Sequence, residues 1–145
     1  MKPRIPRSGI LSAPAQSVAL RKRFPSGLTT WSRRAVRWIG DFCPSEFGRN
    51  YLVELRYEIG DKPDVWVREP NLAQFTNGRK LPHVYDQKAQ RLCLYFPGVG
   101  FWQPNMALAR TILPWSCLWL YTFEIWSVTD VWHTRGIHPD GLKID

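Results

Sequence analysis

The chain has 145 residues, enough for one compact domain, and 44% of them are hydrophobic, a share typical of globular proteins. The net charge of +8 arises in the first third, where ten Lys or Arg face two acidic residues up to Arg49; from Asn50 onward ten face ten. The longest apolar run, residues 112–126, contains Glu124 and is too short for a bilayer, so we expect no membrane span. Three cysteines without a secretory signal favour a reducing cytoplasm.

The N-terminal region combines prolines with basic residues. Residues 1–16 contain Pro3, Pro6 and Pro14 and predict a flexible basic tail, followed by a single domain over residues 17–145. The stretch QSVALRKRF predicts a short helix, which Pro25 and Gly27 would end.

Strand patterns follow the helix. Residues 34–42 and 51–59 alternate apolar and polar side chains, with Glu54 on the polar face of the second segment. This period of two predicts a sheet that is solvated on one side. Residues 60–63 form a turn signal and DVWVRE, residues 64–69, predicts the next strand, so short connections favour an antiparallel meander.

The second half begins with an irregular region and ends with a helix. Residues 70–104 have no clear period, but their many aromatic residues indicate an ordered, packed segment of the kind where sites are built. Residues 111–129 are apolar on nearly all sides and predict a central, buried helix that begins near Pro114. The chain is therefore predicted to be α+β, with the helix packed on the sheet.

Cys93 is the candidate nucleophile, although its neighbours Leu92 and Leu94 are equally typical of a small buried thiol. Cys117, among helix aromatics, is predicted to be a core residue, and Cys43 beside a proline to be structural. Glu124, within this apolar helix, is predicted to be a buried carboxylate that forms a hydrogen bond with a backbone group or a basic side chain. No metal is expected, because the cysteines lie far apart and the pair His133 and His138 has no cysteine partners.

The motifs resemble those of ubiquitin-conjugating (UBC) enzymes. LPHVY stands where that family has HPNVY, so Pro82 matches the proline, His83 falls on the asparagine and Leu81 replaces the histidine. RLCLY matches the cysteine segment, and FWQP, residues 101–104, matches a later tryptophan element. The sequence departs from the family in a loop before the cysteine about two residues longer and in having no second long C-terminal helix.

A closer resemblance is to the conjugating-enzyme-like proteins of bacterial type II CBASS anti-phage operons, which accompany a cGAS/DncV-like nucleotidyltransferase (CD-NTase). It rests on LPHVY, LCLYFPG, ILPW and the final tryptophan, glycine and His-Pro pattern, over roughly residues 17–139. It implies that Cys93 forms a thioester with the C-terminus of the nucleotidyltransferase, or of a ubiquitin-like protein, and passes it to an amine. Such conjugation would prime the nucleotidyltransferase for signalling.

The chemistry of thioester transfer predicts roles for further residues. His83 can donate a hydrogen bond to the tetrahedral oxyanion or deprotonate the amine, and Arg91, two residues from Cys93, can favour the thiolate. His83 can equally be an ordinary solvated loop residue. Tyr85, Tyr95 and Trp102 are predicted to shape the pocket. No cofactor is expected, since neither a GxxxxGK loop nor a Rossmann glycine pattern is present.

Two other functions compete with this one. The first is a UBC-like module that binds the same partner without transfer. The second is a nucleic-acid-binding module that uses the basic N-terminal third, although no known nucleic-acid-binding motif supports it. We expect Arg33, Arg34 and Arg37 to face a protein partner instead.

Overall fold

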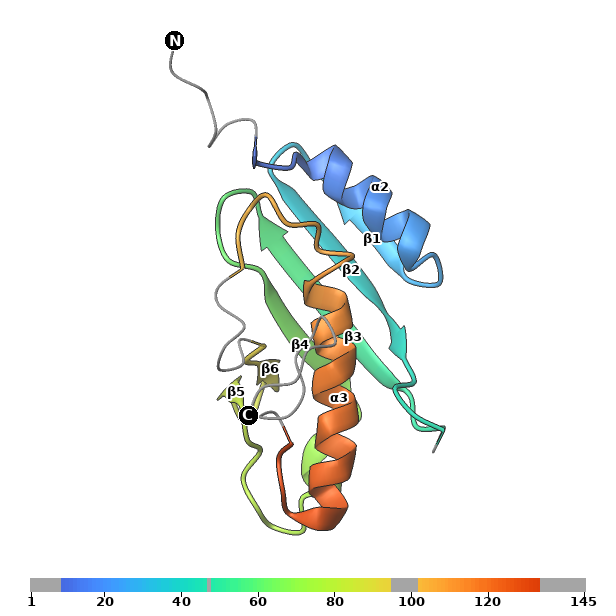
Figure 1. Cartoon of the computed structure of the whole chain (residues 1–145), viewed down its shortest axis with the longest axis vertical. Coiled ribbons are helices and arrows are strands. Elements are labelled where there is room, and N and C mark those ends of the chain that lie inside the picture. The colour runs from blue at the N-terminus through green and yellow to red at the C-terminus, as the bar shows by residue number, and fades with distance from the viewer. Residues whose placement is uncertain (1–8, 47, 95–101, 134–145) are drawn as a thin grey trace.

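The computed structural model describes residues 9–46, 48–94 and 102–133. Its strands form one antiparallel sheet of six in the order β1-β2-β3-β4-β6-β5, and helices α2 and α3 lie across one face of it (Figure 1). The predicted α+β architecture with an antiparallel meander is confirmed. The elements are α2 (Ala13–Arg23), β1 (Leu28–Trp31), β2 (Ala35–Phe42), β3 (Tyr51–Glu58), β4 (Asp64–Glu69), the 3-10 helix η1 (Leu72–Phe75), β5 (Val84–Asp86), β6 (Arg91–Leu92) and α3 (Ile112–Thr129).

Helix α2 begins earlier than its sequence pattern predicts. Ser12 caps it by accepting a 3.2 Å hydrogen bond from the Ala15 amide, and a proline lies in the first turn. Helix α2 therefore includes the last four residues of the predicted tail, residues 13–16. Gln16 is fully buried and binds the loop before α3, donating to the Met106 carbonyl at 3.0 Å and accepting from the Leu108 amide at 2.9 Å.

A cluster of aromatic rings joins α2 to the sheet. The indole of Trp38 is fully buried, stacks on Phe42 at 5.5 Å and donates to the Phe24 carbonyl at 3.3 Å. Two glycines make room for it: a Cβ atom at Gly27 would lie 2.3 Å from the indole, and one at Gly40 would lie 2.7 Å from it. Any side chain at either position would force the tryptophan out of this cluster.

Helix α3 is tied to β3 through a buried carboxylate. Glu124 is buried, as the sequence predicted, but its partners are two hydroxyls rather than a basic or backbone group. The Tyr51 hydroxyl donates to it at 2.7 Å and the Ser45 hydroxyl at 2.5 Å. Burial and the bond to Glu124 raise the pKa of Tyr51 above its ordinary value of 10.0, so this tyrosine stays protonated.

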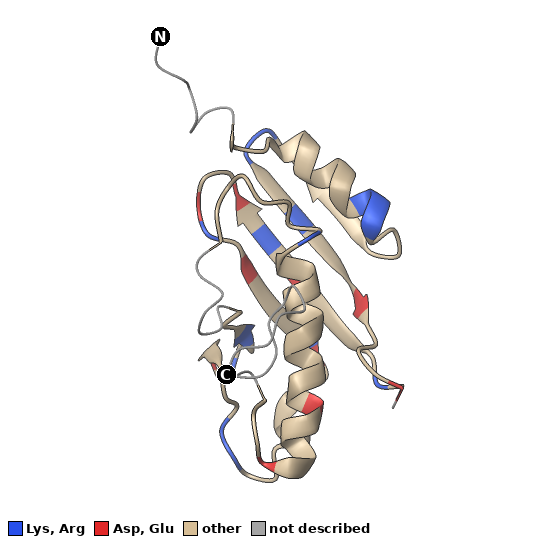
Figure 2. Cartoon of the chain, in the orientation of Figure 1, with Lys and Arg blue, Asp and Glu red and all other residues tan. Residues whose placement is uncertain are grey.

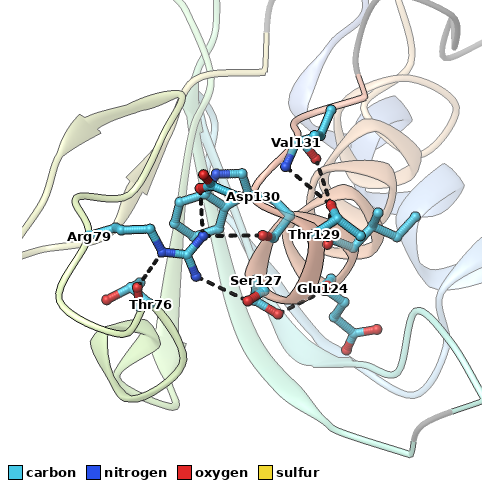
Figure 3. A network of polar contacts seen from close by, with 9 residues as sticks. Thr76, Arg79, Glu124, Ser127, Thr129, Asp130 and Val131 are labelled. Carbon is cyan, nitrogen blue, oxygen red and sulfur yellow. Dashed lines mark hydrogen bonds and ion pairs between the residues drawn. The ribbon is translucent and has the colours of Figure 1, made fainter.

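Arg79 fixes the C-terminal end of α3 to the chain that leads into β5 (Figure 3). Its guanidinium donates to the Ser127 carbonyl at 3.0 Å and to Asp130 at 2.8 Å, and lies 4.1 Å from the ring centre of Trp126. A cation at a helix C-terminus binds carbonyls that have no partner within the helix and opposes the helix dipole. Among the described residues, no helix is both long and apolar enough to cross a membrane.

The outer face of the sheet, away from the helices, departs from its sequence pattern at Glu54. This residue lies on the predicted solvated face but is only 3% exposed. Arg37, Arg56 and Arg68, from three adjacent strands, cover it and donate to its carboxylate at 2.7, 2.7 and 2.8 Å. Burial alone would raise the pKa of this carboxyl, but the three hydrogen bonds outweigh it and lower the pKa from 4.5 to about 2.

This shift predicts how stability depends on pH. The pKa of Glu54 is lower in the folded state than in the unfolded state. Its contribution to the free energy of unfolding is therefore fully present above about pH 4.5 and is lost as pH falls towards about 2. Replacing Glu54 with Gln should therefore cost about 2 kcal/mol of unfolding free energy at neutral pH and little at the acid end. Urea denaturation of both proteins across this range measures the difference. Glu58→Gln, an exposed change on the same strand, serves as the control, and an equal effect of the two substitutions would contradict this account.

Candidate active site

Cys93 lies directly after a small hairpin at the edge of the sheet. Strands β5 and β6 form the hairpin, in which Val84 pairs with Leu92, and β6 joins the main sheet where Arg91 pairs with Trp66. Gln87 closes the preceding loop, because its side-chain amide accepts from the Leu81 amide at 2.9 Å and donates to the Leu81 carbonyl at 2.7 Å. The Gln87 side chain thus satisfies both backbone groups of Leu81, as a neighbouring strand would, just before His83.

The structure brings Cys93 and His83 together through their backbones. The Cys93 amide donates to the His83 carbonyl at 3.0 Å, which extends the hairpin pairing by one step. His83 adopts a left-handed conformation with φ 52°, uncommon for a residue other than glycine. The two residues predicted to act together therefore lie next to each other just beyond the paired ends of β5 and β6.

The leucines beside Cys93 are buried, but Cys93 is not. Leu92 is 2% exposed and Leu94 is 4% exposed, whereas the cysteine between them is half-buried. In an extended segment, alternate side chains point to opposite sides. The leucines anchor the segment in the core, and the half-buried cysteine points to the other side of the segment.

The imidazole of His83 packs against an aromatic cluster on the C-terminal side of α3. Its ring centre lies 5.0 Å from that of Trp132, which in turn contacts Trp119 at 5.2 Å and Trp126 at 6.5 Å. Desolvation by these contacts lowers the pKa of His83 below its ordinary value of 6.5. The imidazole is therefore neutral at pH 7, although part of the side chain remains exposed.

Trp119 is the site residue that the sequence pattern did not reveal. Its indole N–H donates to the His83 carbonyl at 2.9 Å, so one carbonyl accepts from both Trp119 and Cys93. Helical spacing identified Trp119 only as a core residue. Nothing in the sequence signals this bond, because it joins residues 36 positions apart.

Arg91 is engaged with other groups. Its guanidinium forms an ion pair with Asp64 at 3.2 Å and lies 4.9 Å from the ring centre of Tyr85. The carboxylate of Asp64 offsets the positive charge that the sequence analysis expected to favour the Cys93 thiolate.

The other two cysteines lie away from the hairpin. Cys43 is exposed after β2, where its thiol donates to the Ser45 carbonyl at 3.4 Å. Cys117 is half-buried on α3, and burial, with smaller effects of Cys43 and Glu124, raises the pKa of its thiol. A raised pKa keeps Cys117 in the unreactive thiol form.

The remaining predicted site residues are dispersed. Tyr85 is 48% exposed on β5, whereas Trp102 is buried, contacts the ring of Tyr57 at 4.9 Å and donates to Thr111 at 3.1 Å. Arg33 and Arg34 are exposed between β1 and β2, and Arg37 pairs with Glu54. Tyr95 lies outside the described residues.

The described residues contain no group of three or more His, Cys, Asp or Glu that could hold a metal ion. His133 is exposed just after α3, and His138 lies outside the described part of the chain.

Comparison with known families agrees with the motifs. The model of the family described as Type II CBASS E2 protein matches residues 16–139 of the chain. A search of curated proteins gave no match.

The shared carbonyl makes Trp119 a test of how the site is held. Replacing Trp119 with Phe keeps an aromatic ring but removes the N–H donor, so we expect a loss of about 1 kcal/mol in unfolding free energy. We also expect faster hydrogen exchange at the Cys93 amide, measured by NMR, because the hairpin loses its tie to α3. Trp115→Phe is the matched control, a buried tryptophan on the same helix. Equal exchange rates at Cys93 in both variants would contradict this role of Trp119.

Proposed function

Since the chain belongs to the type II CBASS E2 family, we propose that it is a conjugating enzyme whose Cys93 carries an acyl group as a thioester. The donor is the C-terminal residue of a CD-NTase or of a ubiquitin-like protein, and the acceptor is an amine. The observation that carries the proposal is the position of Cys93. It is half-buried at the end of a hairpin, whereas the leucines on either side of it lie in the core.

The chemistry has two steps. In the first, the Cys93 thiolate attacks the carbonyl carbon of a C-terminus already activated elsewhere; the C–S bond forms and the activating group leaves with its electron pair. In the second, an amine attacks the thioester carbonyl through a tetrahedral oxyanion, which collapses to an amide as the thiolate leaves. The amine loses its proton to solvent or to a nearby base.

His83 is proposed to stabilise the oxyanion. Its imidazole is neutral at pH 7 and keeps one N–H, and the hydrogen bond between their backbone groups makes His83 and Cys93 neighbours. The resemblance places His83 where conjugating enzymes have asparagine, another side chain with an N–H donor. Both residues tolerate the left-handed backbone found at this position better than most.

The two competing functions differ from this proposal in what they require. A non-catalytic binding module has no need of an accessible thiol at Cys93. A nucleic-acid-binding module would bind in a salt-sensitive way, and charge reversal at Arg33, Arg34 and Arg37 would abolish that binding. Arg33 and Arg34 are exposed, and together with Arg37 they are the residues that we propose to face a protein partner.

A thioester adduct tests the catalytic proposal. The protein is co-expressed with the CD-NTase and the other proteins encoded beside it, so that the C-terminus can be activated, and is examined by intact mass spectrometry without reductant. We expect an adduct in the wild type that hydroxylamine removes, and none in Cys93→Ala.

Two other cysteine variants control this experiment. Cys43→Ser and Cys117→Ala should form the adduct as the wild type does, because these thiols lie away from the hairpin. An adduct that survives Cys93→Ala, or one lost in Cys43→Ser, would contradict the assignment of Cys93.

Single-turnover discharge of the preloaded protein to free lysine tests His83. Because loading is complete before the measurement, only transfer is observed. We expect His83→Ala to slow transfer by about a hundredfold, the usual cost of one oxyanion donor. His83→Asn should stay within a few-fold of the wild type, since it restores an N–H donor.

The pH profile separates the two roles of His83. As an oxyanion donor, His83 stays neutral above its lowered pKa, so above pH 6.5 the rate should depend on pH in the same way in the wild type and in His83→Asn. A general base would instead lose its activity in His83→Asn, and that loss would overturn the proposed role.

A further inference from the structure

The outer face of the sheet carries a second feature that the proposed reaction does not use. Three arginines surround the buried carboxylate of Glu54: Arg37 from β2, Arg56 from β3 and Arg68 from β4. Figure 2 shows basic residues on neighbouring strands of the sheet as well as at the end of α2. One carboxylate balances one of the three positive charges, so this cluster, which we call the arginine surface, has an excess of two.

All three arginines bind Glu54 through the same atom. Each donates from Nε, and within the described part of the chain no hydrogen bond occupies their terminal Nη groups. The three side chains are 39%, 59% and 34% exposed. Glu54 therefore fixes the base of each guanidinium and leaves its outward N–H donors available to an external anion.

A tryptophan further restricts these side chains. The guanidinium of Arg68 lies 4.8 Å from the ring centre of Trp66 and that of Arg56 lies 5.6 Å from it. Cation–π contacts of this kind restrict an arginine side chain already in the unbound protein, so the side chain loses less conformational freedom on binding. The surface is thus ordered before any partner arrives, which lowers the entropic cost of recognition.

A groove of about 640 Å³ runs beside the arginine surface. Arg37, Arg56 and Trp66 line it together with Trp31, which is 46% exposed. The groove therefore offers apolar surface next to cationic donors. A partner that fits it carries both apolar groups and carboxylates.

We propose that the arginine surface and its groove bind an acidic peptide segment of a protein partner. Its carboxylates accept hydrogen bonds from the free Nη groups of Arg37, Arg56 and Arg68, and its apolar side chains contact Trp31 and Trp66. Guanidinium forks match carboxylate geometry well, and such charge-assisted bonds are the stronger ones.

The charges around the groove favour a peptide over a nucleic acid. Glu58 and Asp61 also line it, beside Lys62, and these two carboxylates would repel a continuous phosphate backbone. A peptide can place its carboxylates at the arginines and neutral or basic groups beside the acids.

Fluorescence anisotropy with a labelled, end-blocked peptide in which glutamate alternates with leucine and glycine tests this proposal. The variant combines Arg37→Gln, Arg56→Gln and Arg68→Gln with Glu54→Gln, so that no unpaired carboxylate is left buried. We expect it to bind about tenfold more weakly than the wild type at physiological salt. Thermal unfolding confirms that the variant is folded, and the single change Arg56→Gln, at the most exposed of the three, gives a milder test with a smaller loss.

The control removes three positive charges elsewhere. Arg21, Lys22 and Arg23 end α2, and their replacement by Gln should change affinity by less than about twofold. An equal loss of affinity in this control would overturn the proposal, because it would show that peptide binding depends only on the net charge of the protein. An oligonucleotide of the same charge that binds more tightly than the peptide would overturn the choice of a peptide.

Binding at the arginine surface can be tested separately from the proposed reaction. Peptide binding should be the same in Cys93→Ala as in the wild type, whereas the thioester adduct should be absent. Failure of either proposal can therefore be recognised without the other.

Discussion

The His83 carbonyl is the point on which the site depends. It accepts from the Cys93 amide on one side and from the Trp119 indole on the other, and so joins the β5–β6 hairpin to helix α3. Neither element would hold the cysteine alone: the hairpin is short, and α3 contributes no hydrogen bond to Cys93 within the described residues. Short hairpins are marginally stable by themselves, so the tie to a buried helix gives Cys93 a fixed position.

The irregular segment around the site is ordered by side chains that replace backbone partners. Gln87 pairs with both backbone groups of Leu81, and Gln90 accepts from the Leu72 amide at 2.6 Å and donates to the Val67 carbonyl at 2.8 Å. Arg79 does the same for the last carbonyls of α3. Buried backbone groups need partners whether or not a strand supplies them. The glutamines therefore let this region be rigid without regular structure.

The sequence predicts those parts of the fold that depend on local periodicity. Strands β2 to β4 and helix α3 follow their apolar patterns within one or two residues, because each buries one face or all of it. The short strand β1 was not singled out, since most of its four residues are exposed. The sequence pattern also does not predict the burial of Glu54 or the partners of Glu124, because both depend on side chains that only folding brings together. The motif located Cys93 and His83, but no local pattern reveals Trp119 as the donor that links them to α3.

The two proposed sites share one strand pair. Trp66, which lies beside the guanidiniums of Arg56 and Arg68, pairs with Arg91, and Arg91 is two residues from Cys93. A partner held at the arginine surface is therefore confined near the edge of the sheet where the cysteine lies. Confinement of this kind makes the later chemical encounter effectively intramolecular and raises the local concentration of the reacting group. Weak binding at the outer face would then suffice for efficient transfer, and the groove needs to supply orientation more than affinity.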